Sequence, residues 1–385
     1  MHHDKIFLDA RASKTVDFEK SSEETRRPRC SEKGNPSKMR PTTKDLARHA
    51  GVSRATVDRV LNGRPGVQDR TIQAVNKAIE DLGFVRNLSA ANLAKGRIYR
   101  FEFLLPREDG AFLSTLVSQI DDLKAAVKTD GIEITCRRVL DREPHEVVRT
   151  LATITTEQVD GVAIMASESP QVRDALQRLV ERRVHVVQFI SGRRESGQFD
   201  FVGIDNQAAG ATAGRLLGGF SKVATGNVLV ITESMNAFDS VERRLGFDRV
   251  IAARFPGLSV LPTLETYGDT TRAYDVIRCA YRNFPGIVGV YVMSSEASTP
   301  LDAVRKYGDP SCQTVVAHER TALTLALLRR DQVDALITQH PGHVVRSAVR
   351  LLKARSDGRP PFASQEDIRI EILLKENAME AALTA

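Results

Sequence analysis

From Arg100 onward, the sequence alternates apolar runs of strand length with stretches of helical periodicity. The apolar runs fall at residues 101–105, 132–136, 161–165, 184–190, 227–232, 287–293, 313–317 and 334–338. Strands that alternate with helices pair in parallel, and the helices cover both faces of the sheet. A stretch of about 285 residues is too long for one core of this kind, so we expect two similar lobes. The predicted fold class is α/β with doubly wound parallel sheets, and the cleft between the lobes is the expected ligand site.

The segment before this alternation, residues 41–84, contains three short helical patterns. Thr42 is a candidate N-cap for the first helix, and Gly51 permits a tight turn after it. Ser53 can cap the second helix, and the third runs from about Asp69 to Gly83, which ends it. Two short helices joined by a tight turn, with a third packed on them, predict an all-α helix-turn-helix unit.

The positive charge of the chain is concentrated in the same region. The net charge is +6, and residues 40–100 carry 12 Lys and Arg against 5 Asp and Glu. A local positive field of this kind indicates a polyanionic partner, above all nucleic acid. A solvated basic surface is the alternative interpretation of the charge alone.

Several classes of protein are disfavoured by what the sequence lacks. The four cysteines are widely spaced and form no C-x-x-C pair, which argues against a disulfide framework or a cysteine zinc site. No apolar run reaches membrane-spanning length, and the N-terminus has no secretory core, so we expect a cytoplasmic protein. Nucleotide-binding, nucleophile-elbow and zinc-protease motifs are absent, so we expect no enzyme, no cofactor and no metal. His318, His340 and His343 lack the ligand spacing of a metal site and are interpreted as cleft or loop residues.

Specific motifs identify the front segment. The pieces T-x-x-D-L-A-x-x-A-G-V-S, x-x-T-V-x-R-V-L-N-G, the third helix ending L-G-F, and N-x-x-A-x-x-L-A follow one another between Thr42 and Ala94. This run closely resembles the DNA-binding headpiece of the lactose-repressor (LacI/GalR) family. The resemblance implies that a recognition helix enters the major groove, where Arg can bind guanine by two hydrogen bonds.

The resemblance also implies roles for individual residues. Arg54, Ala55 and Arg59 would read bases, whereas Thr43, Ser53, Thr56 and Asn62 would contact phosphates or cap helices. Asn87, Ala90 and Leu93 would form a hinge helix, with Leu93 wedged into the minor groove. Arg54 could instead contact a phosphate, and Leu93 could be a linker contact. Asp58 departs from the family pattern and could accept from cytosine or orient Arg54 or Arg59. Arg86 stands where the family often has proline.

The rest of the chain resembles the family's sensor domain, which shares its fold with periplasmic sugar-binding proteins of the ribose type. The segments F-V-G-I-D-N-Q, V-E-R-R-L-G-F, T-V-V-A-H-E-R-T and I-T-Q-H-P-G carry the likeness. By resemblance, the effector-binding residues are Phe112, Arg243, Glu319 and Gln339, and Glu296 is added where the chain departs from the family pattern. Phe112, Arg243, Glu319 and Gln339 could each instead be a surface or interface residue. The usual asparagine–aspartate pair is replaced around Glu296, and an aspartate–arginine pair is missing after residues 184–190. A sugar or polyol is therefore the leading effector, with a sugar acid or another polar metabolite left open.

These observations predict a domain organisation and a function. Residues 1–39 form a disordered extension or lie before the true start, 40–86 the DNA-binding domain, and 87–99 the hinge or linker. Residues 100–385 form the sensor, with one lobe at about 100–222 and 339–356 and the other at about 223–338 and 357–385. The expected protein is a transcriptional regulator, most simply a repressor, that binds a palindromic DNA operator as a homodimer and responds to a small sugar-like effector. The alternative is an extracytoplasmic sugar-binding protein of an uptake system.

Overall fold

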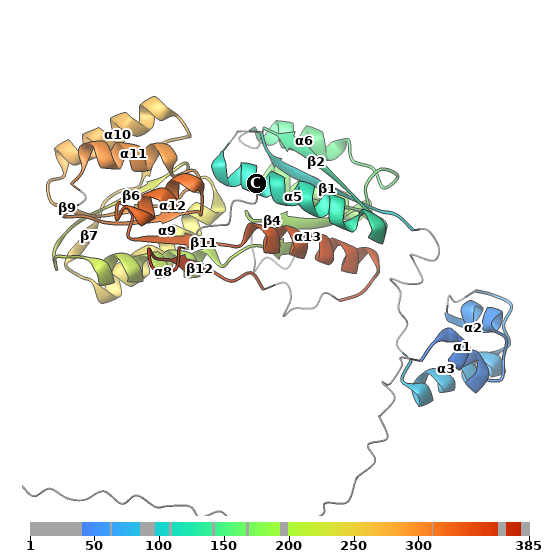
Figure 1. The fold of residues 1–385 in the computed structure, drawn as a ribbon. Helices are drawn as coiled ribbons and strands as arrows, with labels where there is room; N and C mark the ends of the chain where they lie inside the picture. Colours follow the sequence, from blue (N-terminus) through green and yellow to red (C-terminus); the bar gives the residue numbers. More distant parts are fainter. Residues whose placement is uncertain are drawn as a thin grey trace, which may run out of the picture. The chain divides into compact units, whose positions relative to one another are not determined.

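A computed structural model gives the fold of the chain (Figure 1). It describes residues 41–61, 64–84, 97–107, 110–140, 143–166, 169–192, 199–309, 311–360 and 367–378. The chain divides into two compact units, Met1–Arg86 and Asn87–Ala385. Among the described residues, no helix combines the length and hydropathy that crossing a membrane requires.

The described part of the first unit contains three helices, α1 (Thr43–His49), α2 (Arg54–Leu61) and α3 (Asp69–Leu82). The predicted capping box is present: the Asp45 amide donates to the Thr42 hydroxyl at 3.4 Å, and the Thr42 amide donates to the Asp45 carboxylate at 2.9 Å. Gly51 and Gly83 both have positive φ, which glycine adopts at little cost where a helix ends. The small core of this unit consists of Leu46, Ala47, Val57, Val75 and Ala78.

The second unit begins with a five-stranded parallel sheet of order β2-β1-β3-β4-β5. Its strands are β1 (Tyr99–Pro106), β2 (Ile132–Val139), β3 (Gly161–Ile164), β4 (His185–Phe189) and β5 (Asp200–Val202). Its helices are α5 (Ala111–Val127), a 3-10 turn (Lys128–Asp130), α6 (Pro144–Ala152), α7 (Pro170–Glu181) and α13 (Pro341–Ser356). We call this sheet with its helices the first lobe.

Alternation along β1 explains why the first lobe has helices on both faces. Phe101 and Phe103 pack into a core with α5 and α13, whereas Leu104 points to the opposite face and packs with α6 and α7. Successive side chains of a strand point to opposite faces, so a strand buried on both faces requires cover on both sides. Glu102 interrupts the apolar run at residues 101–105, but it is also buried, and both faces of β1 are therefore covered.

The second lobe is a larger sheet of order β12-β11-β10-β9-β6-β7, with β8 paired to β6. All its pairs are parallel except that of β11 with β12. The strands are β6 (Gly226–Thr232), β7 (Leu258–Val260), β8 (Leu264–Glu265), β9 (Ile287–Val292), β10 (Thr314–His318), β11 (Ala335–Thr338) and β12 (Glu371–Leu373). The helices are α8 (Asn206–Phe220), α9 (Phe238–Arg254), α10 (Thr270–Asn283), α11 (Ser298–Tyr307) and α12 (Ala322–Arg329).

The boundary between the lobes differs from the sequence prediction. The sequence assigns residues up to 222 to the first lobe, but α8 packs against α9, β9 and β10 of the second. Gly210 on α8 and Gly246 on α9 explain this packing. A Cβ on Gly210 would lie 1.8 Å from the Arg243 carbonyl oxygen, and one on Gly246 would lie 1.9 Å from the Gln207 carbonyl oxygen. The first lobe therefore ends before α8, because two glycines let α8 and α9 approach backbone to backbone.

A second boundary difference lies at the end of α13. The sequence assigns residue 357 to the second lobe, but Asp357 is bound to the first. It accepts hydrogen bonds from Tyr99 on β1 and Lys353 on α13. β12, which follows, pairs with β11 and so belongs to the second lobe.

Candidate functional site

The α2 helix presents polar side chains on the outer side of the three-helix unit. Arg54, Ala55 and Arg59 are exposed, whereas Val57 is fully buried against α1 and α3. The Ser53 hydroxyl accepts from the Thr56 amide at 3.1 Å and so caps the helix, as the sequence predicts. One face of α2 is thus held by the core, and the other leaves two guanidinium groups open to a partner.

Of the other residues predicted to contact DNA, the structure describes only some. Thr43 is half-buried at the start of α1, and Asn62, Asn87, Ala90 and Leu93 lie outside the described residues. The Asp58 carboxylate lies 3.8 Å from the Arg64 guanidinium. That neighbour was not anticipated from the sequence, which pointed to Arg54 or Arg59.

In the second unit, Arg243 on α9 lies at the centre of a buried polar cluster. Its side chain is 3% exposed. Nε donates to the Asn206 side-chain oxygen at 2.9 Å, and Nη1 donates to the Met293 carbonyl at 2.6 Å. Nη2 lies 3.9 Å from the carboxylates of both Asp239 and Glu319. The guanidinium therefore joins α8 and α9 to the carboxyl ends of β9 and β10.

Glu319 follows β10 and is completely buried. Its carboxylate accepts from the Thr338 hydroxyl at 2.8 Å, and from the backbone amide and side-chain Nε2 of Gln339, each at 3.4 Å. Burial raises its pKa, while Arg243 and these hydrogen bonds act in the opposite direction. The structure thus brings together Arg243, Glu319 and Gln339, three of the five residues that the resemblance implies for effector binding.

His318 and Tyr291 extend the cluster inward. The Tyr291 hydroxyl and His318 Nε2 are 2.9 Å apart, and the Tyr291 ring stacks on Phe247 with centroids separated by 4.7 Å. Burial, together with the Arg243 charge, holds the pKa of His318 well below its ordinary value. Burial raises the pKa of Tyr291. Both side chains are therefore neutral near pH 7 and can only exchange hydrogen bonds.

Three polar atoms of this cluster have no hydrogen-bond partner among the described residues. They are Nδ2 of Asn206, Nδ1 of His318 and Oε1 of Gln339. A buried polar atom left unpaired costs about 1–3 kcal/mol, so such an atom in a native protein requires an explanation, and a bound water, ion or ligand is one. The set offers donors and an acceptor beside the compensated charges of Arg243 and Glu319. A neutral molecule rich in hydroxyl groups matches these requirements.

Phe112 and Glu296, the other two predicted effector ligands, meet at a different place. Phe112 on α5 is 1% exposed and belongs to the main core. The Glu296 carboxylate accepts from the amides of Ala111 and Phe112, at 3.1 and 3.2 Å. Both residues lie where the second lobe touches the first, and their contact with an effector stays a prediction.

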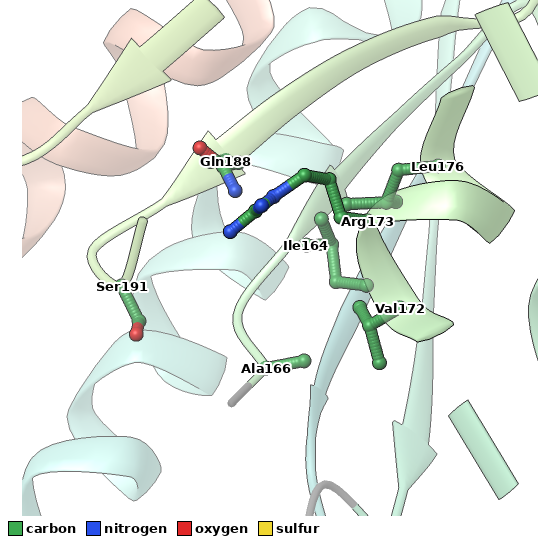
Figure 2. Close-up of a pocket in the computed structure, with 7 residues that line it drawn as sticks. All are labelled: Ile164, Ala166, Val172, Arg173, Leu176, Gln188 and Ser191. Carbon is green, nitrogen blue, oxygen red and sulfur yellow. The ribbon is translucent and has the colours of Figure 1, made fainter. Parts of the chain in front are cut away.

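The sequence reasoning missed a recess in the first lobe, at the carboxyl ends of β3 and β4. It is lined by Ile164, Ala166, Val172, Arg173, Leu176, Gln188 and Ser191. Figure 2 shows the Arg173 side chain extending from α7 toward Gln188 on β4. Carboxyl ends of parallel strands are the usual binding edge of this fold, which is the one signal that could have pointed here.

The cluster around Arg243 also contains residues that the sequence did not select as ligands. Asn206 directly follows the helix cap Asp205, while His318 and Thr338 end their strands. Position at a strand end was the available signal for His318 and Thr338. No three His, Cys, Asp or Glu side chains within the described ranges gather in a way that could hold a metal ion.

The fold and the cluster define a class. A helix-turn-helix unit precedes a two-lobed α/β domain with a polar site at the strand ends, and residues 101–360 match the family described as periplasmic binding protein domain. Residues 42–87 match the bacterial regulatory proteins of the lacI family. The chain therefore belongs to the family of periplasmic binding protein domains, and its front segment, residues 42–87, matches the DNA-binding domain of the lacI family.

Curated relatives match the chain over part of their length. The transcriptional regulator RegA of Clostridium saccharobutylicum is 33% identical over 168 residues, which is 44% of this chain and 48% of that protein. Catabolite control protein A of Staphylococcus xylosus is 27% identical over 255 residues, covering 63% of this chain and 71% of the relative. Against RegA and the Streptococcus mutans catabolite control protein A, the chain spans only 48% and 36% of the relative's length.

Solved structures share the fold of the sensor. GanP, a glucose-galactose binding protein from Geobacillus stearothermophilus, has a TM-score of 0.64 at 20% identity and covers 73% of this chain and 99% of its own. A transporter solute-binding protein from Burkholderia graminis in complex with D-arabinose has a TM-score of 0.65 at 21% identity, with coverages of 74% and 98%. At these identities, the likeness establishes the fold alone.

Proposed function

We propose that the protein is a cytoplasmic, non-enzymatic transcriptional regulator that binds a palindromic DNA operator as a homodimer. The observation that carries the proposal is the exposed face of α2, where Arg54 and Arg59 project from a helix whose other face is locked by Val57. A helix of this size fits the major groove, and guanidinium groups bind guanine there. Arg54, Ala55 and Arg59 would read bases, while Thr43, Ser53, Thr56 and Asn62 would contact phosphates or cap helices.

The proposed hinge follows from the match of residues 42–87 to the lacI family. Asn87, Ala90 and Leu93 would order on operator DNA, with Leu93 entering the minor groove and kinking the duplex. A two-fold dimer would place two such segments side by side on a two-fold operator.

The effector is proposed to be a sugar or a related neutral polyol bound at the Arg243 cluster. Support comes from the unpaired atoms of Asn206, His318 and Gln339 beside the balanced charges of Arg243 and Glu319. Two proteins of similar structure are a glucose-galactose binding protein and a solute-binding protein in complex with D-arabinose, which supports a sugar here. An effector that favours one lobe arrangement would change operator affinity by about 1–3 kcal/mol.

Operator affinity with and without effector tests this function. Sugars, sugar acids and polyols are first screened for a rise in the melting temperature of the full-length protein. Each hit is then added to the protein with fluorescent genomic fragments, and binding is followed by anisotropy. A 5- to 150-fold change in operator affinity is the expected result for about 1–3 kcal/mol of coupling. If the protein binds a sugar but no DNA fragment, the result would instead support the alternative of a sugar-binding protein of an uptake system.

A further inference from the structure

Glu296 makes a contact that crosses from one lobe to the other. It lies in the loop between β9 and α11 of the second lobe, yet its two carboxylate oxygens accept from backbone amides of α5 in the first lobe. The oxygen-to-nitrogen distances are 3.1 Å to Ala111 and 3.2 Å to Phe112. These are the first amides of α5, which have no acceptor within the helix.

The residue at the N-cap of α5 is Gly110, and it leaves room for this carboxylate. Its φ of −158° is extended backbone that any residue can adopt, so conformation does not require glycine there. The lack of space does require glycine there, because a Cβ on Gly110 would lie 2.1 Å from Oε1 and 2.3 Å from Cδ of Glu296. Gly110 offers no capping side chain of its own, so Glu296 performs the capping from the other lobe.

The surroundings hold Glu296 in this position. The Ser294 hydroxyl donates to the Glu296 carbonyl at 3.3 Å and tightens the loop. A carboxylate at a helix N-terminus is further stabilised by the helix dipole. Ser294 follows Met293, whose carbonyl accepts from Arg243, so the same loop contacts both the buried cluster and α5.

We propose that Glu296 is an interlobe latch, a positioning residue that caps α5 across the lobe boundary and holds the two lobes together without an effector. The latch gives the sensor a resting arrangement of its own. In the effector-free sensor the two lobes are then already in contact through Glu296. The effector binds to this arrangement and is not needed to bring the lobes together. The proposal depends on neither DNA binding nor the identity of the effector.

Hydrogen exchange on the full-length protein without ligand tests the latch. The amides of residues 111–113 have no helical acceptor, so their protection in the wild-type protein comes from Glu296. Glu296→Ala should speed their exchange at least tenfold, and Gly110→Ala should do the same with Glu296 intact. Glu296→Gln keeps one acceptor oxygen and should recover part of the protection. Exchange along β9 serves as the internal check that each variant is folded.

Glu265→Ala is the matched control, because the Glu265 carboxylate accepts from the Met235 amide within the second lobe. Glu265→Ala should leave the hydrogen exchange of the first α5 amides unchanged. A second readout is the distance between spin labels on Cys136 in the first lobe and Cys279 in the second, both exposed, with the other cysteines replaced by serine. Glu296→Ala and Gly110→Ala should broaden this distance distribution toward longer values. Folded variants with wild-type α5 exchange and an unchanged distance would overturn the proposal.

Discussion

The Arg243 guanidinium and the Glu319 carboxylate lie 3.9 Å apart inside the second lobe, and their side chains are 3% and 1% exposed. Each is bound by neutral partners as well: Asn206 and Met293 on the arginine, Thr338 and Gln339 on the glutamate. Charges removed from water in this way depend on one another, because losing one leaves the other uncompensated. The pair therefore links the stability of the lobe to the site proposed for the effector.

Removing either partner should have unequal effects. Arg243→Ala leaves a buried carboxylate without its cation and should lower the free energy of unfolding by about 3–5 kcal/mol. Glu319→Gln should cost only about 1 kcal/mol, because the Asp239 carboxylate still lies 3.9 Å from the Arg243 guanidinium and glutamine still accepts from Thr338. Urea unfolding of the two variants measures both values. Arg278→Ala, which removes an exposed ion pair with Asp275, is the control and should change the free energy by less than about 0.5 kcal/mol. Equal losses for Arg243→Ala and Glu319→Gln would contradict this predicted difference, because they would show that Asp239 does not compensate Arg243.

Two glycines of α8 should respond in opposite directions to the same substitution. A Cβ on Gly210 would meet the Arg243 backbone at 1.8 Å, whereas a Cβ on Gly219 has nothing within 4 Å. Gly210→Ala should therefore destabilise the protein by about 1–3 kcal/mol or more, because α8 and α9 must separate. Gly219→Ala should be neutral or stabilising by up to about 1 kcal/mol, since alanine favours a helix. Thermal unfolding of both variants tests the pair, and a similar melting temperature for the two would show that α8 and α9 are not closely packed.

His318 should make the stability of the protein depend on pH. Its pKa is held well below the ordinary value by burial, so the folded protein keeps it neutral while the unfolded chain titrates near 6.5. Its stabilising contribution is present above that value and is lost as the pH falls toward the folded pKa. Between pH 7.5 and 5.5, the loss should be about 1 kcal/mol.

The His318 contribution is isolated by comparing variants. His318→Gln should show a smaller fall in unfolding free energy over the same interval than the wild-type protein. Glu319, with its raised pKa, makes stability change with pH in the opposite direction, and it is retained in both proteins. If the unfolding free energies of the wild-type protein and His318→Gln fell equally with pH, a group other than His318 would cause the pH dependence.

Arg59 should contribute to specificity rather than to general affinity. Arg59→Ala removes an exposed guanidinium from α2 and should cost about 1–3 kcal/mol on the operator and much less on random DNA. Lys77→Ala removes an equal charge from the exposed side of α3 and should weaken both kinds of DNA alike or neither. Anisotropy titrations at one fixed salt concentration measure the four affinities. An equal loss on operator and random DNA from Arg59→Ala would make it a phosphate contact.

The sequence predicted what depends on local pattern. The strands β6 and β9 contain apolar runs, and β1 contains one that only Glu102 interrupts. The caps at Thr42 and Ser53 follow from side chains at the starts of their helices. β5, β7, β8 and β12 were missed because segments of two or three residues carry no period. The boundary before α8 depends on how Gly210 meets Arg243, and the bond from Glu296 to Ala111 joins residues far apart in the chain. Such contacts are tertiary, and no local pattern encodes them.

Selection of bound sequences from a random double-stranded DNA library tests the proposed regulator most directly. The purified full-length protein is incubated with the library without effector, and the retained DNA is sequenced after several rounds. A two-fold symmetric motif should be enriched, and Arg59→Ala should relax its preference at the symmetry-related base pairs. Enrichment of no motif, or of the same sequences by a protein lacking residues 1–86, would contradict DNA recognition through α2.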